Sequence, residues 1–156
     1  MAIGYMLDTN VFNRALCGEV PEDAFIGRKL FSTHIQLDEI GRTKNPSRLA
    51  ELGVIFETLS PTDVATTTAI WDDSNFDQAN WDGGRDHDTM LLRLRDMDKL
   101  SGKKSSEELN QSRDVRIAET AIEHGLILVS DDVNLVTLTI EFGGKAISIT
   151  EFSNIA

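Results

Sequence analysis

Short apolar runs alternate with longer amphipathic stretches along most of this chain. Residues 2–7 and 126–130 are mostly apolar, as in strands that are buried on both faces of a parallel sheet. Residues 54–59 combine β-branched and aromatic side chains and predict a third strand, and shorter strands are expected at residues 31–32 and 146–149. The pattern therefore predicts several strands of one central sheet.

Helices are expected between these strands, because apolar residues recur there at helical spacing with capping and stop signals nearby. The segments that carry these signals are residues 11–17, a stretch from Pro21, residues 35–40 and 48–52, a stretch from Ser60, and residues 89–100, 112–124 and 133–141. Strands that alternate with helices predict an α/β fold, a three-layer α/β/α sandwich with a mainly parallel central sheet. We expect a single domain over residues 1–156, with an extended loop and helix excursion at about residues 72–111.

Composition narrows the class of protein without identifying it. The 156 residues are 40% hydrophobic and 26% charged, which is typical of a globular domain with its own core. No apolar stretch approaches the roughly 18 residues of a membrane span, so we expect no membrane partner and a cytoplasmic location. Cys17 is the only cysteine, which excludes an internal disulfide and a multi-cysteine zinc site. We expect it to be a small buried side chain on an early helix.

The net charge of −11 argues against loose, nonspecific binding of nucleic acid, which requires a basic surface. It is compatible with a nuclease whose metal ions or clustered basic residues supply positive charge locally. Arg42 lies in one basic cluster with Lys44 and Arg48, and Arg113 and Arg116 flank Asp114. These side chains are either candidate substrate contacts or a solvated helix surface.

Acidic residues follow two of the predicted buried strands. Asp8 comes directly after residues 2–7, and Asp131 and Asp132 follow residues 126–130. Ligands of parallel α/β sheets bind in the crevice outside the carboxyl ends of the strands. Carboxylates gathered there repel one another unless a cation lies between them, and oxygen ligands suit Mg²⁺ or Mn²⁺. Asp8 has an ordinary alternative role as a helix N-cap.

Two further acids lie on predicted helices. Asp114 is expected on the first turn of its helix and on the same face as Ile117 and Ala118, which must pack inward. An inward carboxylate needs a partner, either a metal or the dipole at the start of the helix. Glu39 alone would be read as a surface charge. Of Asp131 and Asp132, one is expected to face the crevice and the other to cap the next helix, and spacing leaves open which.

At this point the residues resemble a known family, the PIN-domain ribonucleases. Residues 5–11 (Tyr-Met-Leu-Asp-Thr-Asn-Val) resemble the opening motif of that family. The second motif resembles residues 33–40 with its acid on Glu39, and the third resembles residues 112–121 with its acid on Asp114. Residues 126–131 resemble the fourth, a strand followed by Ser or Thr and then Asp. The ordered set covers essentially the whole domain.

This resemblance implies a Mg²⁺- or Mn²⁺-dependent endoribonuclease of the kind found as the toxin in VapBC-like toxin–antitoxin pairs. RNA would be the substrate, an antitoxin protein a possible partner, and a homodimer the expected assembly. The implied catalytic residues are Asp8, Glu39, Asp114 and Asp131, with the metal on Asp8, Asp114 and Asp131, or on Asp132 as the alternative to Asp131. Thr9, Asn10 and Ser130 would orient carboxylates or substrate, and Arg42, Arg113 and Arg116 are candidate substrate-binding residues.

The excursion at residues 72–111 is longer and more acidic than the resemblance predicts, and we interpret Asp86-His87-Asp88 within it as a solvated loop. Other classes stay open. A haloacid-dehalogenase-type phosphatase needs a second Asp where Asn10 stands, and a response-regulator receiver needs adjacent acids after its first strand. A PIN-like binding module without catalytic activity would keep the same fold.

Overall fold

A five-stranded parallel sheet is the centre of the fold. The computed structural model describes residues 3–66, 87–102 and 108–155. The strands are β1 (Gly4–Leu7), β2 (Lys29–Ser32), β3 (Thr62–Asp63), β4 (Ile127–Ser130) and β5 (Lys145–Ser148). They lie in the order β3-β2-β1-β4-β5, and every pairing is parallel. The predicted α/β class with a mainly parallel sheet is confirmed.

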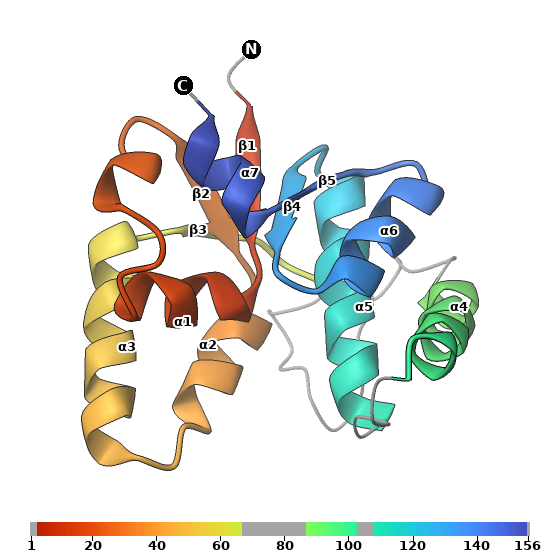
Figure 1. Ribbon diagram of the computed structural model, residues 1–156, viewed down its shortest axis with the longest axis horizontal. Helices are drawn as coiled ribbons and strands as arrows, with labels where there is room; N and C mark the ends of the chain where they lie inside the picture. The colour runs from red at the N-terminus through yellow and green to blue at the C-terminus, as the bar shows by residue number, and fades with distance from the viewer. Residues whose placement is uncertain (1–2, 67–86, 103–107, 156) are drawn as a thin grey trace.

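Helices cover both faces of this sheet (Figure 1). They are α1 (Thr9–Leu16), the 3-10 helix η1 (Glu22–Ala24), α2 (His34–Gly41), α3 (Pro46–Leu59), α4 (His87–Leu100), α5 (Glu108–Glu123), α6 (Val133–Glu141) and α7 (Ile149–Asn154). Alternate side chains of β1 enter two different cores, because successive residues of a strand point to opposite faces. Leu7 packs with Phe12 of α1 and Leu52 of α3, whereas Met6 packs with side chains of α4, α5 and α6.

The strand predicted at residues 54–59 is wrong, because these residues complete the long helix α3. Asn45 caps this helix, with Oδ1 accepting from the N–H groups of Ser47 and Arg48, and Pro46 stands at its first position. Leu49, Leu52, Ile55 and Leu59 then recur at helical spacing and pack against one core. Tertiary packing of this stripe outweighs the β propensity of the individual residues.

The chain after α3 also differs from expectation. Ser60 does not start a helix; it ends α3 with a left-handed backbone, φ 45°, and Thr62–Asp63 forms the edge strand β3. Cys17 is exposed just after α1, so its expected burial is wrong. Helix α5 starts earlier than predicted, which places Asp114 on its second turn and not on its first. Of the loop expected at residues 72–89, residues 72–86 lie outside the described residues, and residues 87–89 instead begin α4.

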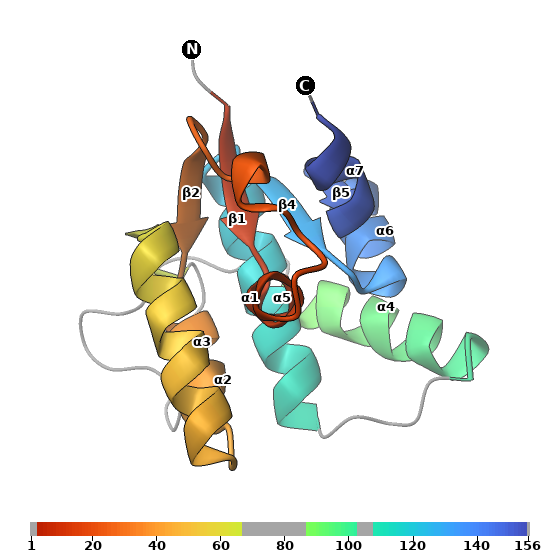
Figure 2. The same ribbon diagram turned by 60° about the vertical axis from the view of Figure 1, so that its left-hand side comes forward.

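The direction of the strands determines where polar side chains can meet. In Figure 2 strands β1, β2 and β4 run the same way. The carboxyl end of β1 leads into α1, that of β4 into α6 and that of β2 into α2. The chain leaves β1 for β2 on one side and returns to β4 on the other. The point where the strand order reverses is the place where parallel sheets bind ligands, and it lies here between β1 and β4. Within the described ranges, no helix is long and apolar enough to cross a membrane.

Candidate functional site

Asp8 is the most buried acid at this reversal point, with only 5% of its surface exposed. Its backbone N–H donates to the carbonyl of Val129 on β4 at 3.0 Å, which ends the pairing of the two strands. Its Oδ1 accepts from the N–H of Thr9 at 2.8 Å, so Asp8 is also the N-cap of α1. The carboxylate is thus held between a strand end and a helix start, where the N-terminal helix dipole favours its charge.

Ser130 joins this carboxylate to the other strand. Its hydroxyl donates to Oδ2 of Asp8 at 2.7 Å and accepts from the N–H of Asp132 at 3.0 Å. Ser130 is 1% exposed, so these bonds form away from competing water. The carboxyl end of β1 and the turn from β4 to α6 are therefore fixed relative to each other through one hydroxyl group.

Asp131 and Asp132 take different directions after β4. Asp132 caps α6, with Oδ1 accepting from the N–H groups of Asn134 at 3.0 Å and Leu135 at 3.3 Å. The side chain of Asp131 is 43% exposed and forms an ion pair with Arg14 of α1. Its backbone N–H donates to Oδ1 of Asn10 at 3.3 Å. The carboxylate of Asp131 is therefore paired with Arg14. Asp132 is instead connected to Ser130, because its backbone N–H donates to the Ser130 hydroxyl.

Glu39 reaches the same region from α2. Burial raises the pKa of Glu39 above its usual value, and the carboxylate of Asp8 raises it further. The guanidinium groups of Arg113 and Arg42 lower it. The structure thus brings Glu39 within electrostatic reach of Asp8, and it adds two cations around the pair.

Helix α2 is placed by a buried amide. The side chain of Gln36 donates to the carbonyl of Leu7 at 2.9 Å, and its Oε1 accepts from the backbone N–H of Thr33 at 2.9 Å. Thr33 and Gln36 together form the capping box of α2. Gln36 therefore fixes the start of the helix that carries Glu39 against the last residue of β1. Sequence reasoning missed this role, although the Thr-x-x-Gln spacing is a known signal of a capping box.

The basic residues are buried to very different degrees. Arg42 is exposed, whereas Arg113 is 6% exposed and Arg116 is fully buried, so their interpretation as a solvated surface is wrong for α5. A nitrogen of Arg116 lies 3.3 Å from Nε2 of His34. Arg116 is thus not available to a substrate in this structure. Asp114 is half-buried on the turn of α5 that also carries Arg113.

His87 also contradicts its interpretation as part of a solvated loop. It starts α4 and is 7% exposed, with Nε2 at 3.3 Å from the Ser112 hydroxyl and Nδ1 at 3.8 Å from Oε1 of Glu119. Burial lowers the pKa of His87, and Glu119 and Asp88 oppose this shift. His87, Ser112 and Glu119 are all buried, so their contacts connect α4 to α5 and do not present a nucleophile. Asp86 lies outside the described residues.

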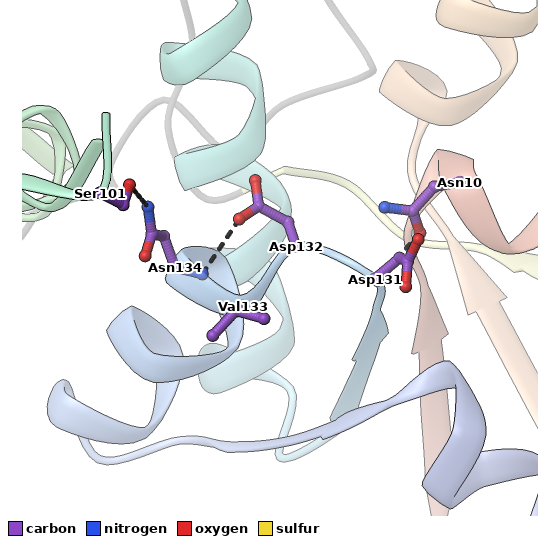
Figure 3. A pocket seen from close by; sticks show the side chains of 6 residues that line it. All are labelled: Asn10, Ser101, Asp131, Asp132, Val133 and Asn134. Carbon is purple, nitrogen blue, oxygen red and sulfur yellow. Dashed lines mark hydrogen bonds between the residues drawn. The ribbon is translucent and has the colours of Figure 1, made fainter. Parts of the chain in front are cut away.

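An open hollow of about 460 Å³ adjoins the acidic side chains. Figure 3 shows its six lining residues, from the start of α1, the end of α4 and the turn into α6: Asn10, Ser101, Asp131, Asp132, Val133 and Asn134. Sequence reasoning had assigned Asn10, Asp131 and Asp132 to the site, but not Ser101, Val133 or Asn134. Ser101 and Asn134 belong to elements whose proximity only the folded chain reveals.

The described residues contain no group of three or more His, Cys, Asp or Glu side chains arranged to hold a metal ion. Mg²⁺, however, is commonly bound by only one or two carboxylates, with water and substrate phosphates as its other ligands. Asp8 and Glu39 offer such a pair of oxygen ligands, close enough for each to feel the other's charge. The donor set of this region therefore fits a hard divalent cation.

Comparison of this sequence with known families and characterised proteins finds no relative. No protein-family model matches the chain, and no characterised protein matches its sequence significantly. Solved structures share its fold. A chain of the VapBC2 complex from Rickettsia felis, crystallised with a DNA fragment from their promoter, matches with a TM-score of 0.51 at 15% identity, covering 94% of this chain and 98% of that one.

Two archaeal structures match to a similar extent. PAE2754 from Pyrobaculum aerophilum has a TM-score of 0.54 at 18% identity, covering 97% of this chain and 94% of that one. A domain of a functionally unknown protein from Methanocaldococcus jannaschii has a TM-score of 0.50 at 15% identity, covering 94% and 91%. At these identities the likeness defines the fold alone. The chain has the PIN-like α/β/α fold that its motifs predict.

Proposed function

We propose that this protein is a Mg²⁺- or Mn²⁺-dependent endoribonuclease. The single observation that carries the proposal is the hydrogen-bonded connection from Asp8 through Ser130 to the turn at Asp132, with Glu39 within electrostatic reach of Asp8. Buried carboxylates at a strand reversal point are costly unless a cation or donors compensate them. The fold likeness to a chain of the VapBC2 complex, which was crystallised with a promoter DNA fragment, is compatible with this chemistry.

Asp8 and Glu39 are the proposed metal ligands. Asp114 and Asp132 are proposed as further ligands that would reach the ion only once it is bound, because the described residues hold no preformed group of three acids. A divalent ion bound there supplies a Lewis acid for the scissile phosphate and lowers the pKa of the attacking water. We assign Asp132 in place of Asp131, because the carboxylate of Asp131 is paired with Arg14 and 43% exposed. In this scheme the hydroxyl of Ser130 and the backbone N–H of Thr9 orient the carboxylate of Asp8, because each donates to one of its two oxygens.

Positive charge for an RNA backbone has two sources in this proposal. The metal supplies one, and the guanidinium groups around Glu39 supply the other. Arg113 and Arg42 both lower the pKa of Glu39, so each lies within electrostatic reach of the site. Exposed Arg42 is the better placed to contact a phosphate. The net charge of −11 over the whole chain disfavours RNA binding outside this local region.

We further propose that the protein acts as the toxin of a toxin–antitoxin pair, with an antitoxin partner and a homodimeric assembly. The VapBC2 complex of Rickettsia felis, which has the same fold, supports this assignment. A binding module without catalytic activity is the second candidate. It is favoured by the finding that the described residues contain no three-residue metal-binding cluster.

The test is cleavage of purified structured RNA with Mg²⁺ or Mn²⁺, and with EDTA. Wild-type protein is compared with Asp8→Asn and with Asp38→Asn, a neighbouring acid on α2 that serves as the matched control. We expect discrete products from wild type and Asp38→Asn, and none with EDTA or Asp8→Asn. If the wild-type protein binds Mn²⁺ but does not cleave RNA, the binding module is favoured. If Asp8→Asn still binds the metal and still cleaves RNA, the proposed site is rejected.

A further inference from the structure

The hollow beside the acidic side chains has a polar character that suggests its ligand. Asn10 lies on one side of it, Ser101 and Asn134 lie on the other, and Asp132 and Val133 lie between them (Figure 3). Its volume of about 460 Å³ is within the usual range for sites that bind small organic groups. Helices α4 and α6 pack against each other, and α1 packs against β4, the strand that leads into α6, so the fold itself places these walls.

The amide of Asn10 is oriented by one hydrogen bond. Its Oδ1 accepts from the N–H of Asp131 at 3.3 Å, which assigns the oxygen to that side of the group. The nitrogen then points into the space between Asn10 and Asp132 (Figure 3). Among the described residues it donates to no acceptor, so Asn10 offers a hydrogen-bond donor to a ligand.

The amide of Asn134 is fixed in the opposite sense. Its nitrogen donates to Oδ1 of Asp98 at 2.8 Å and to the hydroxyl of Ser101 at 3.1 Å, so both of its protons are used. Asp98 is 3% exposed and also accepts from Gln111 at 2.8 Å, which anchors the contact in buried structure. Both amide protons of Asn134 are thus used, and only its oxygen could accept a hydrogen bond from a ligand.

Charge decides which class of ligand fits. Among the described residues, the lining includes two carboxylates, of which Asp131 is paired with Arg14, and no Lys, Arg or His, so it favours an uncharged ligand over a phosphate group. Val133 is 75% exposed and adds an apolar surface at the first position of α6. A flat, uncharged group with both donors and acceptors fits this combination. We propose that the hollow is a nucleobase subsite for a nucleotide next to the scissile phosphate.

This inference rests on the proposed function and adds a base preference to it. Carboxylates only accept hydrogen bonds, so bases that carry an exocyclic amino group suit a hollow with Asp132 and the Asn134 oxygen in its wall. Adenine, cytosine and guanine have such a group, whereas uracil presents carbonyl oxygens in its place. Unpaired nucleotides expose these edges, so the substrate is single-stranded at this position. The subsite binds uracil most weakly.

The test is titration of isotope-labelled protein with adenosine, cytidine, guanosine and uridine in EDTA, followed by NMR. Nucleosides carry no phosphate and need no metal, so the measurement is independent of catalysis. We expect the amide signals of Asn10 and Asn134 and the methyl signals of Val133 to shift, with uridine binding most weakly. Asn10→Ala or Val133→Ala should weaken binding about tenfold, the loss expected for one hydrogen bond or a similar contact.

Ile140→Ala is the matched control, because Ile140 is also exposed on α6 but does not line the hollow. Thermal unfolding of each variant shows whether it is folded, and exposed Val133 keeps the test valid if Asn10→Ala does not fold. The subsite is rejected if no nucleoside shifts these signals, if uridine binds as well as the others, or if both variants bind normally. RNA cleavage without nucleoside binding would reject the subsite alone; nucleoside binding without cleavage would reject the nuclease alone.

Discussion

The hydroxyl of Ser130 donates a 2.7 Å hydrogen bond to Oδ2 of Asp8, a residue 122 positions earlier in the chain. Both side chains are at least 95% buried, so water does not replace this bond when it is lost. The same hydroxyl accepts from the N–H of Asp132, and it thereby connects two strand ends and a helix cap. The candidate site and the stability of the fold thus depend on the same oxygen atom.

Ser130→Ala should weaken both the stability of the fold and the activity of the candidate site. It removes the hydrogen bonds that the Ser130 hydroxyl makes to a buried carboxylate oxygen and to a backbone N–H, which costs about 1–3 kcal/mol in the free energy of unfolding. RNA cleavage should fall roughly 10- to 100-fold, as for other residues that orient a metal ligand. Urea unfolding and a cleavage assay measure the two effects, with Ser153→Ala on α7 as the control. Unchanged stability and cleavage would show that the bond is unimportant.

Asp132→Asn and Asp131→Asn should differ sharply in activity. Asparagine keeps the oxygen that caps α6, so Asp132→Asn should fold normally but lose roughly 100-fold in cleavage rate with its charge. Asp131→Asn should retain most activity, because that carboxylate pairs with Arg14 at an exposed position. If Asp131→Asn cleaves RNA more slowly than Asp132→Asn, Asp131 and not Asp132 is the fourth acid of the site.

Glu39 should make metal binding and stability depend on pH. Its raised pKa means that the folded protein holds the proton more tightly than the unfolded chain, whose carboxyl has a pKa near 4.5. The stability from this shift is fully present below pH 4.5 and is lost as the pH rises through the raised pKa. Mn²⁺ must displace the same proton, so its affinity should rise with pH over that window.

Calorimetric Mn²⁺ titrations and urea unfolding at several pH values test this dependence. Glu39→Gln imitates the protonated side chain, so it should remove the loss of stability with rising pH and weaken Mn²⁺ binding. Asp38→Asn, one residue earlier on α2, should leave both profiles unchanged. A Mn²⁺ affinity that is independent of pH in wild type would mean that Glu39 does not bind the ion.

His87 should have the opposite effect to Glu39 on the pH dependence of the free energy of unfolding. Its pKa is lowered by burial, so below its usual value of 6.5 the unfolded chain binds a proton that the folded protein does not. The free energy of unfolding should therefore fall as the pH drops from 6.5 to the lowered pKa. His87→Asn should flatten this part of the stability curve, whereas a change at exposed His124 should not. Equal flattening by both substitutions would contradict the assignment.

Much of the fold could be predicted from the sequence because strong local signals agree with it. Residues 4–7 and 127–130, within the apolar runs predicted as strands, form two central strands, and the acids that follow them lie at the reversal point. The strand predicted at residues 54–59 was wrong, because β-branched residues were given more weight than the helical spacing of Leu49, Leu52 and Leu59. Tertiary packing decides such cases, and short propensity windows do not contain it.

The candidate site was predictable in part for the same reason. Asp8 and Glu39 approach each other because each follows a clear strand or cap signal. Spacing could not choose between Asp131 and Asp132, because that choice depends on Arg14, which is distant in sequence. The burial of His87 depends equally on distant partners on α5. Contacts between residues that are distant in the sequence leave no local pattern, so they could not be predicted from the sequence.

The most direct test of the central claim is anomalous diffraction from crystals of wild-type protein soaked in Mn²⁺. The account predicts a strong anomalous peak between the carboxylates of Asp8 and Glu39, on the Asp132 side of the β4–α6 turn, and its loss in Asp8→Asn crystals. A peak only at the Asp131–Arg14 side, or no peak at the Asp8 carboxylate in well-ordered crystals, would contradict it.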